Sequence, residues 1–127
     1  MKAKLITLIV FLVALVSCES TKNNTPNGLG EVTVKGTFTS VANPCPKGSD
    51  PCLPGMEVAL SADKIYYLNN IHVEEIFDEQ TLSTLYILDG DTLMETDSVQ
   101  IRGNLFEYID KHDNKYYRIN VNKYNLL

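Results

Sequence analysis

The sequence lacks the local patterns that mark most small enzymes. It has two histidines in 127 residues, and it contains neither a glycine-flanked serine elbow nor a glycine-rich phosphate loop. Nucleophilic catalysis needs a base beside the nucleophile and a third group that orients the base. His72 lies in an alternating apolar stretch and His112 lies in a polar turn, so neither has such a setting. We therefore expect no catalytic residues and two solvated surface histidines.

The chain also lacks an apolar run long enough to cross a membrane as a helix, which needs about 20 residues. Its one long apolar run, residues 5–16, follows Lys2 and Lys4 and ends at Leu15-Val16-Ser17-Cys18. This layout is typical of a secretory signal. A cysteine directly after Leu-Val-Ser resembles the lipobox of bacterial lipoproteins, whose cysteine is lipidated and becomes the first mature residue. The alternative is an ordinary secretory signal with an incidental cysteine.

The lipobox resemblance implies a signal peptide over residues 1–17 and a lipid anchor on Cys18. It places the protein in the cell envelope, on the periplasmic or cell-surface side of a bacterial membrane. Basic charge is scarce once residues 1–17 are removed, because nine basic residues then face sixteen acidic ones, a net charge of −7. Such a chain repels phosphate backbones, which argues against nucleic-acid binding. It also repels anionic lipid surfaces, so the lipid on Cys18 rather than the protein surface would attach it to the membrane.

Cysteine is scarce as well, since lipidation of Cys18 leaves only Cys45 and Cys52. In an oxidising compartment such a pair predicts a disulfide. The alternative is a redox or metal site, but the six intervening residues are not the two of a redox pair and no histidine is nearby to complete a zinc site. Residues 43–55 also hold four of the five prolines, so they predict a loop that a disulfide would stabilise by about 2–3 kcal/mol.

Residues 18–30 are polar and predict a flexible tether, and residues 31–127 predict one β-domain. Period-two alternation predicts strands near 32–40, 56–60, 64–68, 84–88, 98–105 and 117–121. Residues 71–85 are ambiguous between a strand and a helix with Ile76, Leu82 and Leu85 inward. Asp89-Gly90 predicts a hairpin turn. Gly36 and Gly103 lie inside predicted strands and indicate a sharp bend and, near Gly103, a bulge.

These features predict an all-β fold, a small antiparallel OB-like barrel with five main strands plus an extra hairpin. From Val32 onward the chain resembles small, largely uncharacterised bacterial lipoproteins. The resemblance implies an OB-like barrel and no known activity. It rests on the motifs Gly36-Thr37-Phe38, Pro54-Gly55-Met56, Tyr66-Tyr67-Leu68 and Asp97-Ser98-Val99-Gln100-Ile101-Arg102-Gly103.

OB-folds bind oligonucleotides and oligosaccharides on the face of strands two and three. We therefore expect a ligand face at Tyr66, Tyr67, Tyr116 and Tyr117, although core packing accounts for about half of the aromatic residues without any ligand. Together these features predict a lipid-anchored, non-catalytic module that binds an envelope protein or glycan and uses no cofactor.

The alternative is a calcium-like metal-binding module or a small enzyme that uses the acidic cluster Asp89–Asp97. Oxygens from Asp89, Asp91, Glu95 and Asp97 would be its ligands, because calcium takes six to eight oxygens. Their spacing is not that of an EF-hand loop, and the turn alone explains Asp89-Gly90.

Overall fold

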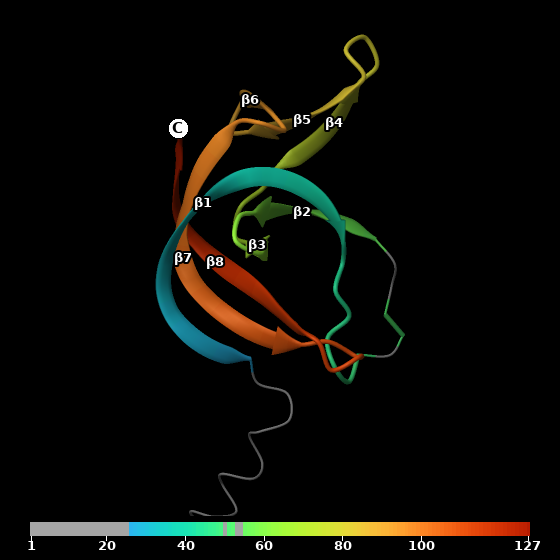
Figure 1. Ribbon diagram of the computed structural model, residues 1–127, viewed down its shortest axis with the longest axis vertical. Coiled ribbons are helices and arrows are strands. Elements are labelled where there is room, and N and C mark those ends of the chain that lie inside the picture. The colour runs from blue at the N-terminus through green and yellow to red at the C-terminus, as the bar shows by residue number, and fades with distance from the viewer. Residues whose placement is uncertain (1–25, 50, 53–54) are drawn as a thin grey trace, which may run out of the picture.

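The computed structural model describes residues 26–49, 51–52 and 55–127, and within these ranges it contains strands and no helix. The predicted all-β fold class is confirmed (Figure 1). The strands are β1 (Asn27–Ala42), β2 (Met56–Ser61), β3 (Ile65–Asn69), β4 (Glu74–Asp78), β5 (Ser83–Leu88), β6 (Asp91–Met94), β7 (Ser98–Ile109) and β8 (Lys115–Leu126).

Five strands form a closed barrel in the order β1-β2-β3-β8-β7, and the other three form a separate sheet in the order β4-β5-β6. Within the barrel β3 and β8 run parallel, while the remaining neighbours are antiparallel. β1 is long enough to pair with β7 through its first part and with β2 through its last part. This is the strand order of an OB-fold, with the sheet β4-β5-β6 inserted between its third and fourth strands.

β1 begins at Asn27, so the prediction of a tether reaching to residue 30 is wrong for its last four residues. Asn27 and Gly28 pair with Glu107 and Phe106 of β7, and the register shifts between Gly28 and Gly30. Gly30 has a φ of 92°, which glycine adopts without the penalty of a side chain. The bulge therefore lets a polar glycine-rich segment continue the strand. Residues 1–17, Cys18 and the rest of the predicted tether up to residue 25 lie outside the described residues.

Two glycines let β1 and β7 approach their neighbours closely, at the positions where a sharp bend and a bulge were expected. A Cβ atom on Gly36 would clash with the carbonyl oxygen of Ser61, and one on Gly103 with that of Asn120. The predicted bulge near Gly103 is present in the β7–β8 pairing, but the extra residue is Asn122 on β8 rather than a residue of β7. The sharp curvature of the barrel depends on these close approaches.

Residues 71–85 form no helix, and the strand alternative is confirmed by the antiparallel pairing of β4 with β5. The predicted helix would have turned Ile76 and Leu82 inward, but these side chains are 38% and 76% exposed. The hairpin instead directs Tyr86, together with Leu88 and Leu93, into the core. The predicted turn at Asp89-Gly90 is confirmed by φ angles of 50° and 83°, the left-handed values that a primed hairpin turn requires.

A single apolar core fills the barrel and continues under the inserted sheet. It is made of Phe38, Leu60, Tyr66, Tyr86, Leu88, Leu93, Val99, Ile101, Ile119 and Val121. In the part of the chain that the structure describes, no helix is long and apolar enough to cross a membrane.

Tyr66 should make the stability of the barrel sensitive to alkaline pH. Burial, and then the hydrogen bond that its hydroxyl donates to Asp63 at 2.9 Å, raise its pKa from 10.0 to about 12. Since the folded state holds this proton more tightly than the unfolded chain, its contribution to stability is complete below pH 10 and is lost as the pH rises through about 12. When tyrosinate absorbance is titrated against pH, Tyr66→Phe should lack the transition of the tyrosine that ionises last in the wild type. Identical titration curves above pH 10 would contradict this.

Candidate functional site

The outer face of β2, β3 and β8 carries a continuous group of polar and aromatic side chains. Alternation along these strands sends Leu60, Tyr66 and Ile119 into the core and the intervening residues to the opposite face. The parallel pairing of β3 with β8 places Tyr67 beside Arg118 and Asn69 beside Asn120. We call this surface the outer face; its residues are Glu57, Tyr67, Asn69, Tyr116, Arg118 and Asn120, together with Ala59, which is fully buried.

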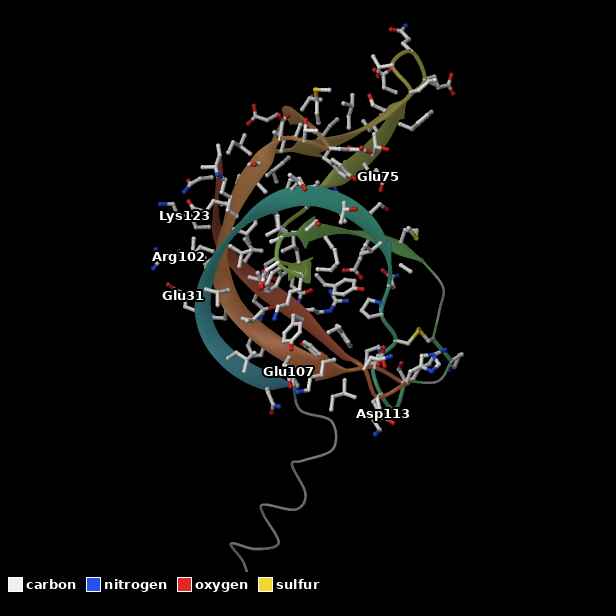
Figure 2. The ribbon with its side chains drawn as sticks, in the orientation of Figure 1. Glu31, Glu75, Arg102, Glu107, Asp113 and Lys123 are labelled. Atoms are coloured by element: carbon white, nitrogen blue, oxygen red, sulfur yellow. A yellow bond between two sulfur atoms is a disulfide. The ribbon has the colours of Figure 1, made fainter. Side chains whose placement is uncertain are left out.

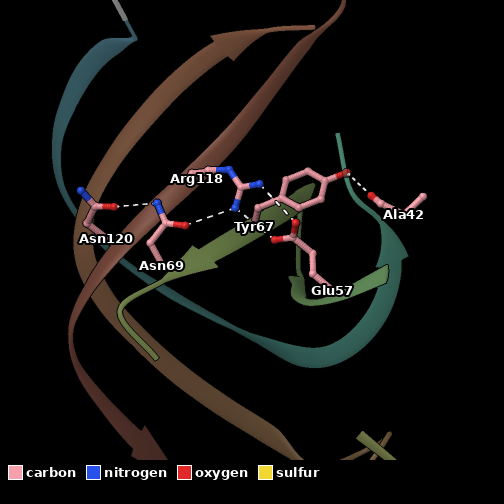
Figure 3. Close-up of polar contacts among 6 residues, drawn as sticks. All are labelled: Ala42, Glu57, Tyr67, Asn69, Arg118 and Asn120. Carbon is pink, nitrogen blue, oxygen red and sulfur yellow. Dashed lines mark hydrogen bonds and ion pairs between the residues drawn. The ribbon is translucent and has the colours of Figure 1, made fainter. Parts of the chain in front are cut away.

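Arg118 is the centre of a hydrogen-bond network on the outer face (Figure 3). Its two terminal nitrogens donate to the two carboxylate oxygens of Glu57 at 3.0 and 3.2 Å, a bidentate arrangement. It also donates to the side-chain oxygen of Asn69 at 3.2 Å, and Asn69 in turn donates to Asn120 at 2.9 Å. The side chains of Arg118 and Glu57 are only 19% and 23% exposed, so this pair is well shielded from water.

Three tyrosines form an aromatic group next to this network. The ring of Tyr116 contacts Tyr67 edge to face at 5.7 Å and stacks on Tyr108 at 5.2 Å between centroids. The guanidinium group of Arg118 lies 5.1 Å from the ring centroid of Tyr67 and 6.0 Å from that of Tyr116, within the range of cation–π attraction. Burial is the main cause that raises the pKa of both Tyr67 and Tyr116, so their hydroxyls stay neutral at physiological pH.

Two loops border the outer face at one end, and they are bound to each other. The first, of which residues 43–49, 51–52 and 55 are described, contains the predicted disulfide between Cys45 and Cys52, which is present with their Cα atoms 5.7 Å apart. The second is the turn at residues 110–114. The backbone nitrogen of Lys47 donates to Ile109 and that of Lys111 donates to Cys45, both at 2.9 Å. These bonds hold the disulfide loop against the turn.

The side chains of the second loop strengthen both the turn and its contact with the first loop. A carboxylate oxygen of Asp110 accepts hydrogen bonds from the backbone nitrogens of His112 and Asn114 at 2.8 and 2.9 Å, which fixes the turn. The ammonium group of Lys47 lies 2.6 Å from Asp113, and this hydrogen bond holds the pKa of Asp113 below its usual value.

A hollow of about 390 Å³ lies where the two loops meet the outer face. This volume is within the usual range of small-molecule and cofactor sites. Tyr67 and, with 7% of its surface exposed, Tyr116 contribute aromatic side chains, and residues with amide, carboxylate, imidazole and ammonium groups complete the lining. The lining residues are Ala42, Asn43, Pro44, Cys45, Tyr67, Asp110, Lys111, His112, Lys115 and Tyr116.

The structure brings together only half of the predicted tyrosine ligand face. Tyr67 and Tyr116 lie on the outer face, where Tyr116 keeps only 7% of its surface exposed. Tyr66 belongs to the core cluster, and Tyr117 packs against that cluster from the inner side. The prediction is therefore wrong for Tyr66 and Tyr117, because adjacent strand residues point to opposite faces. Arg118 and its partners were not predicted, because no local pattern links residues that lie so far apart in the chain.

The predicted acidic cluster does not converge on a metal site. Among the described residues no group of three or more histidine, cysteine, aspartate or glutamate side chains is placed to hold an ion. Asp89 belongs to the hairpin turn, and the carboxylate of Asp97 accepts a hydrogen bond from the backbone nitrogen of Met94 at 2.7 Å. His72 and His112 are both exposed and lie in different connections, the first between β3 and β4 and the second between β7 and β8.

A scan against protein-family models, a search of curated proteins and a search of solved structures each found no match for this chain. The strand order and the arrangement of side chains are therefore the basis for a functional argument.

Proposed function

We propose that this protein is a lipid-anchored, non-catalytic binding module of the cell envelope, and that the outer face with its hollow takes up a glycan. The observation that carries the proposal is the position of the hollow. It lies over Tyr67 and Tyr116, between the loops that follow the first and fourth barrel strands. In OB-folds, the same strands and loops bind oligosaccharides and oligonucleotides.

The chemistry of the lining favours a sugar over an apolar ligand. Tyrosine combines an aromatic ring for the C–H face of a sugar with a hydroxyl that can donate or accept a hydrogen bond. Asn43, Asp110 and His112 add further hydrogen-bonding groups from the two loops. A protein segment is the second candidate for this site, because interface cores are enriched in tyrosine and arginine.

Attachment to the membrane is proposed from the sequence alone. Lipid on Cys18 would hold the domain at the membrane through the chain that precedes β1. Mass spectrometry of the mature protein should find an acylated first residue at Cys18. A free thiol there, or an intact precursor in the cytosol, would refute this part of the proposal.

The binding part is tested with the full-length chain on an array of bacterial envelope glycans. We expect binding above background, and a loss of at least about tenfold in Tyr67→Ala and in His112→Ala, which removes a solvent-exposed side chain from the same hollow. Phe77→Ala is the matched control, because it removes an exposed aromatic ring from the inserted sheet. No bound glycan, or equal binding by all three variants, would refute the glycan proposal.

A further inference from the structure

The inserted sheet presents an open edge at β4. In the order β4-β5-β6, β4 pairs with β5 alone, and its hairpin extends away from the barrel (Figure 1). In the described chain, residues 74–78 make no backbone–backbone hydrogen bond outside their own sheet. An edge of this kind is a template for another extended chain.

The turn chemistry shows which backbone groups face this edge. The residue pair that closes the two-residue turn Asp89-Gly90 exchanges both of its hydrogen bonds, and such pairs alternate along antiparallel strands. When this alternation is followed from the turn along β5 and across to β4, it directs the N–H and C=O groups of Ile76 toward β5. Glu75 and Phe77 therefore direct theirs to the open edge.

Apolar side chains line both faces of the same edge. Phe77 is 59% exposed on one face. On the other, Ile76 lies opposite Leu85, which lies opposite Met94, so the three form a row across the sheet. Of the nine large hydrophobic residues that are exposed in the described chain, four lie in this sheet or its hairpin loop, which is an unusual concentration in a small domain.

The charge of the domain is concentrated on this sheet. Residues 65–101 contain eight carboxylates and no lysine or arginine, whereas residues 26–64 and 102–127 together contain seven acidic and eight basic residues. None of the ion pairs in the described chain includes a carboxylate of residues 65–101. Figure 2 shows Glu75 on this sheet, well separated from Asp113 at the disulfide-loop end of the barrel. The open edge is thus strongly negative, while the barrel is nearly neutral.

We propose that the β4 edge binds a basic, extended polypeptide as an added strand. The backbone of that polypeptide would pair with Glu75 and Phe77. Its lysine or arginine side chains would lie opposite Glu74, Glu75 and Asp78, and its apolar side chains opposite Ile76 and Phe77. The acidic edge disfavours pairing with a second copy of itself, since like charges would face each other, so it selects a partner of opposite charge.

The probe that tests this is a fluorescein-labelled peptide with the core Lys-Val-Val-Lys-Lys, which complements β4 when it runs antiparallel. Its anisotropy is measured with the full-length chain. We expect saturable binding that weakens as salt is added. Glu75→Thr keeps the edge-facing N–H but loses one charge, and Glu75→Pro also loses the N–H, which an edge position tolerates. Glu75→Pro should bind roughly tenfold more weakly than Glu75→Thr.

Controls separate strand addition from general attraction. Glu95→Thr removes one charge from the same segment away from β4, and it should bind nearly as tightly as the wild type. Phe77→Pro compared with Phe77→Ala repeats the test at the second edge position, should Glu75→Pro fail to fold. Equal peptide affinity of the proline variant and its partner variant, in each of the two pairs, would overturn the proposal. So would equal binding of a peptide whose valines are replaced by prolines, or a dimer of the protein that Glu75→Pro abolishes and the peptide does not displace.

Discussion

Gly103→Ala should be among the most destabilising single methyl additions in this protein. The new Cβ atom would clash with the carbonyl oxygen of Asn120 and lie only 2.8 Å from its carbonyl carbon and 2.9 Å from the Cγ2 atom of Ile119. Two of these atoms belong to the β8 backbone, and Ile119 is fully buried, so no flexible side chain can move aside. We expect a loss of about 3 kcal/mol in the free energy of unfolding.

This loss should lower the melting temperature by roughly 12–24 °C for a domain of this size, as measured by circular dichroism. Gly28→Ala is the matched control. It lies on the neighbouring strand β1, and its Cβ atom would make an ordinary contact of 3.5 Å with the ring of Phe106. The control should remain within about 0.5 kcal/mol of the wild type. If Gly103→Ala melted at the same temperature as the control, β8 would be able to move away from the new Cβ atom, and the tight barrel geometry would be refuted.

Gly103 also shows what the sequence could predict about this fold. Alternation located the main barrel strands, and glycines inside that alternation indicated a bend and a bulge, because a missing side chain is visible without any knowledge of the partner. The pattern could not show which strand approaches. The bulge was therefore placed on β7, whereas pairing puts the extra residue, Asn122, on β8.

The two tyrosine pairs show why the candidate site was only half predictable. Tyr66 and Tyr67 are adjacent and chemically identical, so alternation gives no reason to choose which of them faces the core. The choice is made by the parallel pairing of β3 with β8, which brings Tyr67 to Arg118 across 51 positions of the chain. A contact of that range is a property of topology and leaves no local pattern in the sequence.

The net charge was likewise predictable, but its location was not. A total of −7, expected for the chain without residues 1–17, suggests a uniformly acidic molecule. The fold instead separates the inserted sheet, which holds the carboxylates of residues 65–101, from a nearly neutral barrel. Repulsion of anionic ligands, inferred from the total charge, therefore acts most strongly at the sheet and weakly at the outer face.

The ion pair between Glu57 and Arg118 should show strong energetic coupling in a double-mutant cycle. Arg118→Met alone leaves the carboxylate of Glu57 shielded without its partner, and we expect a loss of about 2–3 kcal/mol. Glu57→Gln combined with Arg118→Met should be less destabilising than the sum of the single changes. The coupling energy should be about 1–3 kcal/mol, measured from urea unfolding of all four proteins.

The exposed pair between Glu31 and Arg102 is the matched control for this cycle. Its side chains are 48% and 55% exposed, although its closest nitrogen–oxygen distance is 2.6 Å, shorter than the 3.0 Å of the Glu57–Arg118 pair. Glu31→Gln with Arg102→Met should give a coupling of only about 0.2–1 kcal/mol that fades as salt is added. If distance rather than shielding determined the coupling, the control pair would be the stronger one.

The same cycle separates stability from the proposed ligand site. Arg118 also contacts the rings of Tyr67 and Tyr116, so its removal frees the aromatic surface of the hollow to change conformation. Glu57→Gln keeps those ring contacts and weakens only the ion pair. Glycan binding should therefore fall in Arg118→Met and persist in Glu57→Gln, even where the two variants are compared at equal folded fraction. Equal binding by the two variants would show that Arg118 contributes to the fold alone.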